Sequence, residues 1–256
     1  MGHFEVAARS ATGLVRPGNE DSALTSHRVL AVSDGMGGHA AGEVASKIAI
    51  ETLEKIAAVI TNDDIDAESA DDIFTQTLNV IDSEIASYVE QRPELKGMGT
   101  TFTSLYARGE KIALLHIGDS RAYRLRGNSL EQLSVDHTVI AQLLAAGTIT
   151  EADVSTHPQR SVLTQVLMGE GQTDSALVIL EAKTQDRYLL CSDGLSSVLS
   201  DKEIKSLIKG KERGVAVDAL VEATYVNGAP DNVTVIVADY FDGDHTSEIK
   251  KLGAAQ

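Results

Sequence analysis

Residues 29–43 read VLAVSDGMGGHAAGE, and this stretch changes character halfway along its length. The apolar run Val29–Val32 predicts a buried strand. Ser33-Asp34-Gly35 ends that run, and the glycines that follow predict a tight turn. Helical periodicity begins at Ala41. The stretch therefore predicts a strand that carries one aspartate to a loop rim and is followed directly by a helix.

Further apolar runs bounded by Gly, Asp or Asn predict strands along the rest of the chain. Together the predicted strands are Phe4–Arg9, Arg28–Ser33, Thr101–Ala107, Ile112–Ile117, Ala122–Leu125, Ala176–Leu180, Tyr188–Cys191 and Val233–Ala238. Helices are predicted over Ala41–Ile60, Asp71–Val89, His137–Ala146 and about 214–226. In the first helix we expect Val44, Ile48, Ile56 and Val59 to form the buried stripe. The strands arrive in groups and do not alternate regularly with helices, which favours an α+β sandwich.

The 256 residues and the hydrophobic fraction of 43% suit one sizeable domain, expected over residues 1–242 with a frayed polar tail over 243–256. A net charge of −16 argues against nucleic acid and anionic membranes as partners. The single cysteine excludes an internal disulfide. Because the chain also lacks a long apolar run and a secretory signal, we expect a cytoplasmic protein with no membrane contact.

Three other aspartates stand at strand ends in the same way as Asp34. The strands predicted before residues 118 and 192 run into Asp119 and Asp193, and Asp231 stands just before the last strand. Antiparallel pairing would bring all four carboxylates to one edge. Such a cluster needs positive charge among its members, and oxygen ligands favour Mg²⁺ or Mn²⁺ over zinc.

Each of these motifs also has a plainer interpretation. Any single Asp-Gly pair is better explained as turn chemistry, and it is the repetition at four strand ends that favours a metal site. His116 lies within a strand and is interpreted as a core histidine. Cys191 is interpreted as a small core residue, because Ser197 stands where a cysteine-nucleophile phosphatase needs an arginine.

Six motifs, in order, resemble the PPM family of metal-dependent protein phosphatases, also called the PP2C type. Within that family the chain is most similar to bacterial, actinobacterial members over residues 4–240. The motifs are Gly13–Ser22, Ser33–Glu43, Gly97–Thr101, His116–Arg121, Leu190–Leu195 and Pro230–Thr234. The resemblance implies an α-β-β-α sandwich, with two central, mostly antiparallel sheets flanked by helices and a flap over about 137–171.

The resemblance also implies a centre for two to three Mn²⁺ or Mg²⁺ ions. By position, Asp34 would bridge two ions and the Gly35 carbonyl would bind one of them. Asp193 and Asp231 would complete the other site. Asp119, together with Asp193, matches the site of a third ion in bacterial members.

Other residues match positions around the ions. Glu20 and Asp21 match carboxylates that act through metal-bound waters, and Arg16 matches the arginine that holds the substrate phosphate. Eukaryotic members place a histidine two residues after the bridging aspartate, where this chain has methionine. The general acid is therefore either His39 or a metal-bound water. Arg160, in the flap, has either a substrate-binding or a structural role.

The implied activity is hydrolysis of phosphoserine and phosphothreonine on proteins, including Ser/Thr kinases, by in-line attack of a hydroxide that bridges two ions. A metal-binding pseudophosphatase that serves as a phosphoprotein scaffold is the alternative, and the complete ligand set favours the enzyme. A two-metal nuclease is disfavoured by the acidic charge. We expect a monomer.

Overall fold

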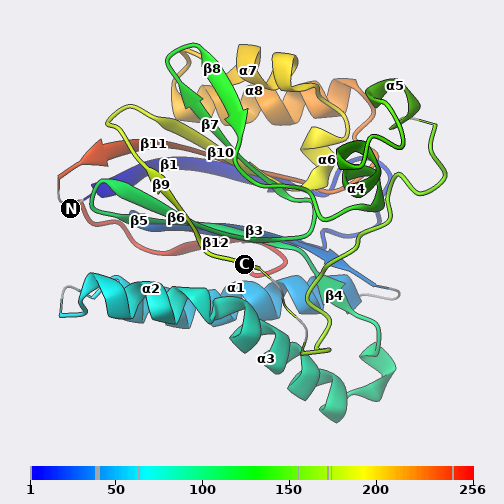
Figure 1. Cartoon of the computed structure of the whole chain (residues 1–256), viewed down its shortest axis with the longest axis horizontal. Coiled ribbons are helices and arrows are strands. Elements are labelled where there is room, and N and C mark those ends of the chain that lie inside the picture. The colour runs from blue at the N-terminus through cyan, green and yellow to red at the C-terminus, as the bar shows by residue number, and fades with distance from the viewer. Residues whose placement is uncertain are drawn as a thin grey trace.

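Two antiparallel sheets lie face to face between two layers of helices in the computed structural model (Figure 1). It describes residues 2–37, 41–62, 64–154, 156–171, 173, 175–243 and 245–256. The strands are β1 Gly2–Ala11, β2 Asp21–Thr25, β3 Val29–Met36, β4 Gly99–Thr100, β5 Phe102–Arg108, β6 Lys111–Ile117, β7 Arg121–Arg126, β8 Ser129–Gln132, β9 Val178–Glu181, β10 Arg187–Cys191, β11 Val233–Asp242 and β12 Lys250–Gly253. One sheet has the order β1-β11-β10-β7-β8 and the other β12-β2-β3-β5-β6-β9, with β4 paired to β3. The predicted sandwich is confirmed.

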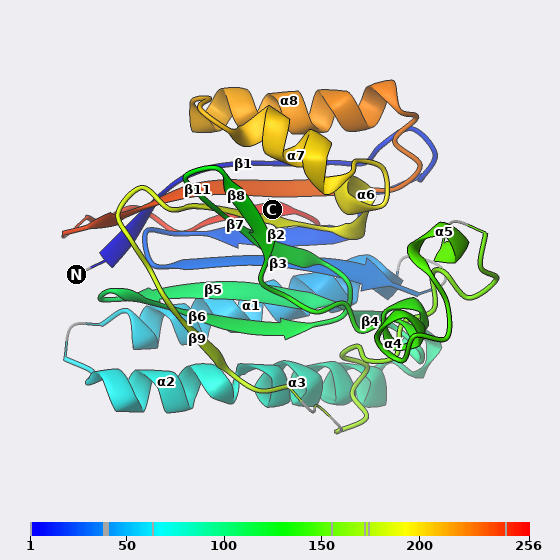
Figure 2. The same cartoon turned by 45° about the horizontal axis from the view of Figure 1, so that its top comes forward.

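The helices are α1 Ala41–Ile60, α2 Ala67–Thr75, α3 Thr77–Gln91, α4 Val139–Ala145, α5 Glu151–Val154, α6 Asp193–Ser196, α7 Asp201–Ile208 and α8 Arg213–Val226, with a short 3₁₀ turn η1 at Pro93–Leu95. Helices α1 to α3 cover the sheet that contains β3, and α7 and α8 cover the other sheet (Figure 2). The helix predicted over Asp71–Val89 is divided at Gln76. Its first part begins earlier than expected, because the Asp66 carboxylate caps the backbone N–H groups of Glu68 and Ser69.

Alternation along the central strands builds three hydrophobic layers. On β3, Leu30 and Val32 point between the sheets, while Val29 and Ala31 point toward the helices. The buried face of α1 differs from the prediction. It is formed largely by small residues, Ala41, Ala45, Ala49 and Ala57, with Ile50, Leu53 and Ile60. The stripe predicted from large residues lies at the margin, and Val59 is 45% exposed. Alanines let the helix approach the sheet closely, which a search for large side chains does not detect.

The C-terminal residues are not a frayed tail, and that prediction was wrong. β12 pairs antiparallel with β2, with Lys250 opposite Thr25 and Gly253 opposite Ser22. Ala255 is 3% exposed within the core beneath α1. Backbone pairing needs no hydrophobic pattern, so a polar segment can form an edge strand.

The segment 137–171 lies at the end of the sandwich where α6 and β4 also lie (Figures 1 and 2). It contains α4 and α5. A bridge between Thr138 and Leu163 closes the segment on itself, and the bridge between Thr100 and Leu167 joins it to the body. At its far end the Asp82 carboxylate of α3 accepts hydrogen bonds from the backbone N–H groups of Met168, Gly169 and Gly171, at 3.0, 2.7 and 2.6 Å.

Candidate metal centre

Four acidic residues, each in or next to a different strand, meet at one end of the sandwich. Asp34 lies near the end of β3 and stands opposite Asp21 of β2 in the antiparallel register. Asp193 follows β10 as the first residue of α6, and Asp231 stands before β11. Because β11 runs antiparallel to β10, its start lies beside the end of β10. The antiparallel arrangement expected from the sequence thus brings these carboxylates together.

Burial and neighbouring negative charge raise the pKa values of Asp21, Asp34 and Asp193 and so favour their protonated forms. Burial, with the nearby Asp193 and Asp231 carboxylates, raises the pKa of Asp21 to about 7 against the opposing effect of hydrogen bonds with Thr234 and Ser192. Burial, and then Asp21, raise the pKa of Asp34 well above its usual range. The pKa of Asp193 is raised by burial and by Asp231, against the opposing effect of a hydrogen bond with Asp34. The cluster therefore contains more negative charge than its surroundings can neutralise.

Asp119 joins the same cluster from the turn after β6. Burial raises its pKa to about 7, and Asp193 contributes next, followed by Asp136. The backbone carbonyl of Gly118 in this turn accepts a 2.8 Å hydrogen bond from the His137 N–H, and the Gly118 N–H bonds to the His137 ring at 3.1 Å. This turn therefore connects Asp119 to the start of the 137–171 segment.

The donor set suits a hard divalent cation. Asp21 Oδ2 accepts a 2.7 Å hydrogen bond from Ser192, whereas Asp21 Oδ1 is buried without a hydrogen-bond partner. Within the described residues, no three carboxylate, imidazole or thiol groups would enclose an ion by themselves. An ion would also need backbone or water oxygens, as Mg²⁺ and Mn²⁺ commonly do. The cluster fits such ions, since each added cation would relieve the repulsion.

Glycine follows both Asp34 and Asp193, and close backbone contact requires it at each position. A Cβ at Gly35 would lie 2.0 Å from the carbonyl oxygen of Gly42 in α1, and one at Gly194 would lie 1.8 Å from that of Asn232. Both distances are far below any van der Waals contact. The Asp-Gly pairs therefore do more than turn the chain, because they let the α1 and β11 backbones reach the site.

Asn232 also belongs to the site, although its position in the sequence predicted no role for it. Its amide nitrogen donates to the carbonyl oxygens of Thr12 and Gly18, both at 2.8 Å. Its side-chain oxygen accepts the Glu20 N–H, also at 2.8 Å. Asn232 thereby fixes both ends of the loop that carries Arg16. Its place in the Pro-Asp-Asn motif was the available signal.

Arg16 lies against the cluster. Its Nη2 donates to Asp231 Oδ2 at 2.6 Å, and its side chain remains 48% exposed. That hydrogen bond raises the pKa of the guanidinium, and the charges of Asp231, Glu20 and Asp34 act in the same direction. Burial raises the pKa of Glu20, which lies at the end of the same loop. A positive, accessible side chain thus stands at the rim of an acidic site.

Arg160 lines a cavity of about 540 Å³ whose other walls include Asp119 and Asp193. The structure therefore brings Arg160 to the edge of the acidic cluster from the flap. The cavity is also lined by Arg121 and Asp136, which form a bidentate ion pair with a shortest distance of 2.6 Å. His39, the candidate general acid, lies outside the described residues.

Two exclusions made from the sequence are confirmed. The ring of His116 bonds to Thr103 Oγ1 at 2.9 Å and to the Val135 carbonyl at 3.0 Å, and burial lowers its pKa to about 4. His116 is thus a neutral core histidine. Cys191 is fully buried, and burial raises its pKa to about 12, so its thiol is not a nucleophile.

A four-layer sandwich with a buried, cation-seeking carboxylate cluster at one end of its sheets is the arrangement of a metal-dependent phosphatase. The family model described as protein phosphatase 2C matches residues 19–224. The chain belongs to the protein phosphatase 2C family.

Bacterial relatives extend this result. The chain is 43% identical over 242 residues to the serine/threonine protein phosphatase PstP of Mycobacterium tuberculosis H37Rv, covering 93% of this chain and 45% of PstP. It thus spans about half the length of that relative. It is 33% identical to the serine/threonine phosphatase stp of Listeria monocytogenes serovar 1/2a, covering 90% of this chain and 94% of stp.

Solved structures share the fold. The catalytic domain of PstP in complex with two manganese ions is 40% identical, with a TM-score of 0.86 over 94% of this chain and all of that one. The Staphylococcus aureus phosphatase Stp1 is 32% identical, with a TM-score of 0.84 over 94% of this chain and 96% of that one. No helix in the described part of the chain is long and apolar enough to cross a membrane.

The cluster predicts an unusual dependence of stability on pH. The pKa of Asp21 and that of Asp119 both rise to about 7 in the folded chain, whereas unfolded aspartates titrate near pH 4. The folded state therefore binds more protons between these values, and the ion-free chain loses stability as pH rises from 5 to 8. We expect its Tm in chelator to fall by about 5 °C or more over this range, and saturating Mn²⁺ to reduce the fall.

Thermal unfolding at several pH values with EDTA or Mn²⁺ measures this effect. Asp119→Asn should flatten the profile in chelator, while the exposed control Asp218→Asn should leave it unchanged. A Tm in chelator that rises toward pH 8 would contradict the electrostatic account.

Proposed function

We propose that this chain is a Mg²⁺- or Mn²⁺-dependent phosphatase that removes phosphate from phosphoserine and phosphothreonine in proteins. The main support is the buried carboxylate cluster, with the unpartnered Oδ1 of Asp21, beneath the exposed guanidinium of Arg16. The named activity of the bacterial relatives, and the two manganese ions in the PstP catalytic domain, agree with this assignment.

In this proposal two ions are held by Asp34, the Gly35 carbonyl, Asp193 and Asp231, and a third by Asp119 with Asp193. Bound ions would lower the pKa of coordinated water and neutralise charge on the phosphoryl group. Glu20 and Asp21 act around the ions by accepting hydrogen bonds from their waters. Bound cations would thus offset the repulsion between the carboxylates.

Arg16 binds the substrate phosphate. Its planar guanidinium can hold two phosphate oxygens at once, and its exposed position at the site rim leaves it accessible. In the ion-free chain it neutralises Asp231. When cations bind that carboxylate, the guanidinium becomes available for the phosphate. The proton for the departing serine or threonine oxygen comes from His39 or from water.

The catalytic domain comprises the whole sandwich with β12 included, and its flap lies over about 137–171. Its substrates include Ser/Thr kinases, it acts as a monomer, and it resides in the cytoplasm. A pseudophosphatase scaffold would bind phosphoproteins by the same residues without turnover, so hydrolysis itself distinguishes the two functions.

Removing one ligand charge tests the metal centre. With Mn²⁺, the chain should hydrolyse a phosphothreonine peptide, EDTA should abolish this activity, and Asp193→Asn should lower kcat by about 100-fold or more. Phosphate release is the measurement, and Asp218→Asn at an exposed aspartate is the matched control. Turnover that persists in EDTA would overturn the proposed site.

Arg16→Ala should lower kcat/KM for the phosphopeptide by about 10- to 100-fold, because charge-assisted hydrogen bonds to the phosphate are lost. Arg16→Lys should restore part of the loss. Arg9→Ala is the control, since Arg9 is also an exposed arginine paired with an aspartate, at 3.1 Å. Steady-state kinetics at saturating Mn²⁺ provide the comparison, and equal effects of Arg16→Ala and Arg9→Ala would reject the phosphate role.

Arg160→Ala should lower kcat/KM for a phosphopeptide by about fivefold, the scale of an exposed ionic contact, and leave hydrolysis of p-nitrophenyl phosphate unchanged. The reason is that Arg160 borders the cavity next to the cluster, where only a peptide would extend. Arg92→Ala, at an exposed arginine outside that cavity, is the control. Equal losses for both substrates would show that Arg160 acts on the site itself.

A further inference from the structure

The C-terminal strand makes direct contact with the acidic cluster. β12 lies at the edge of its sheet beside β2, the strand that begins with Asp21. Beyond the last paired residue, the N–H of Ala254 donates a 2.8 Å hydrogen bond to the backbone carbonyl of Asp21. A segment more than 200 residues away in sequence therefore bonds to a residue of the site.

This contact is too close for any side chain at position 253. Gly253 has a φ of +69°, in the left-handed region, and a Cβ there would lie 2.1 Å from the Asp21 carbonyl oxygen. Ala255 is buried immediately afterwards, and the Gln256 N–H donates to the Gly253 carbonyl at 3.2 Å. Glycine is thus required both by the backbone conformation and by the approach to Asp21.

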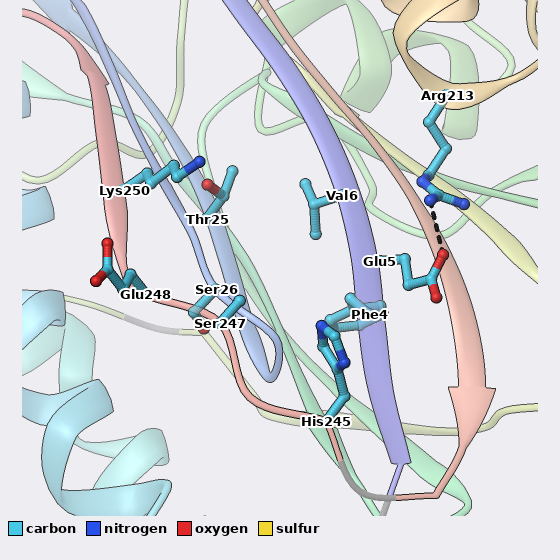
Figure 3. Close-up of a pocket in the computed structure, with 10 residues that line it drawn as sticks. All are labelled: Phe4, Glu5, Val6, Thr25, Ser26, Arg213, His245, Ser247, Glu248 and Lys250. Atoms are coloured by element: carbon cyan, nitrogen blue, oxygen red, sulfur yellow. Dashed lines mark hydrogen bonds and ion pairs between the residues drawn. The ribbon is translucent and has the colours of Figure 1, made fainter.

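The segment that leads into β12 is less closely packed. Figure 3 shows a pocket of about 300 Å³ between β1 and this segment, with Arg213 and Glu5 paired on its far side. At the start of the segment the rings of His245 and His3 stack with centroids 5.0 Å apart. At the other end β12 is held by its pairing with β2 and by the 2.8 Å ion pair between Lys251 and Glu54. The contacts of β12 with β2 and Glu54 therefore do not depend on close packing of residues 245–249.

Asp21 needs such support, because its carboxylate makes few contacts of its own. Oδ2 bonds to Ser192 and the Thr234 hydroxyl lies close to the carboxylate, whereas Oδ1 is buried without a hydrogen-bond partner and the neighbouring acids repel the group. Its direction is therefore set largely by its backbone. Without β12, β2 would be an edge strand with an unpaired carbonyl at Asp21. We infer that β12, through Gly253 and Ala254, is a positioning element that holds the Asp21 carboxylate ready for cations. This inference rests on the proposed metal-dependent function.

Manganese binding to the full chain, measured by calorimetry, tests the inference directly. Gly253→Ala should weaken Mn²⁺ binding by about three- to tenfold, the scale of one buried hydrogen bond. At saturating Mn²⁺, kcat and KM should return close to the wild-type values. The matched control is Gly243→Ala, because Gly243 also has a positive φ, of +113°, but no atom lies within 4 Å of its Cβ position.

A second pair of variants tests the same contact in case Gly253→Ala does not fold. Ala254→Pro removes the N–H that bonds to Asp21, whereas Ala254→Ser keeps it. We expect weaker Mn²⁺ binding only for the proline variant. A purely structural role would lower the Tm in chelator and leave Mn²⁺ affinity unchanged, and that result would overturn the inference. If the wild-type chain binds no Mn²⁺, the proposed function fails as well. If wild type, Gly253→Ala and Ala254→Pro bind equally, the inference alone fails.

Discussion

The burial of several carboxyl groups at one point is the constraint on which the rest of this structure depends. Asp21 is fully buried, Asp34 and Asp193 are partly buried, and burial together with neighbouring carboxylates raises the pKa of each. Without a rigid support, such carboxylates would move apart or become hydrated, because burying like charges together costs free energy. Here each aspartate is attached to a strand whose remaining residues are fixed in three hydrophobic layers. The cores thus hold the acids in place, and cations relieve the repulsion that results.

The repeated Ser-Asp-Gly triplet shows how this arrangement is built locally. In each copy the glycine admits a neighbouring backbone that a side chain would exclude. The serine before it makes a cross-link: Ser33 Oγ donates to the Thr101 carbonyl at 2.9 Å, and Ser192 Oγ donates to Asp21 Oδ2 at 2.7 Å. The Ser192 bond connects the two sheets at the site. In each triplet the serine therefore provides a cross-link, the aspartate a charge, and the glycine the space for a neighbouring backbone.

What could be predicted from the sequence follows from which interactions leave a pattern in it. Apolar strands that end in aspartate predicted the sandwich and the convergence of acids, because burial leaves runs of Val, Ile and Leu. The match to six family motifs supplied roles that spacing alone could not. β12 was missed because a polar edge strand is held by backbone hydrogen bonds, which any residue can make. The alanine face of α1 and the bridging role of Asn232 were missed for a related reason, since both depend on fit to a distant partner.

Charge balance also connects the parts of the proposed mechanism. A phosphate ester brings negative charge to a site that already holds an excess of it, and among the residues described here Arg16 is the cation that donates a hydrogen bond to the cluster, through Asp231. Substrate would therefore bind poorly to the ion-free chain, because it would compete with Asp231 for that guanidinium. Cations at the aspartates would both release Arg16 and attract the phosphate. Ion binding and substrate binding must then favour each other to the same extent, as any pair of linked equilibria requires.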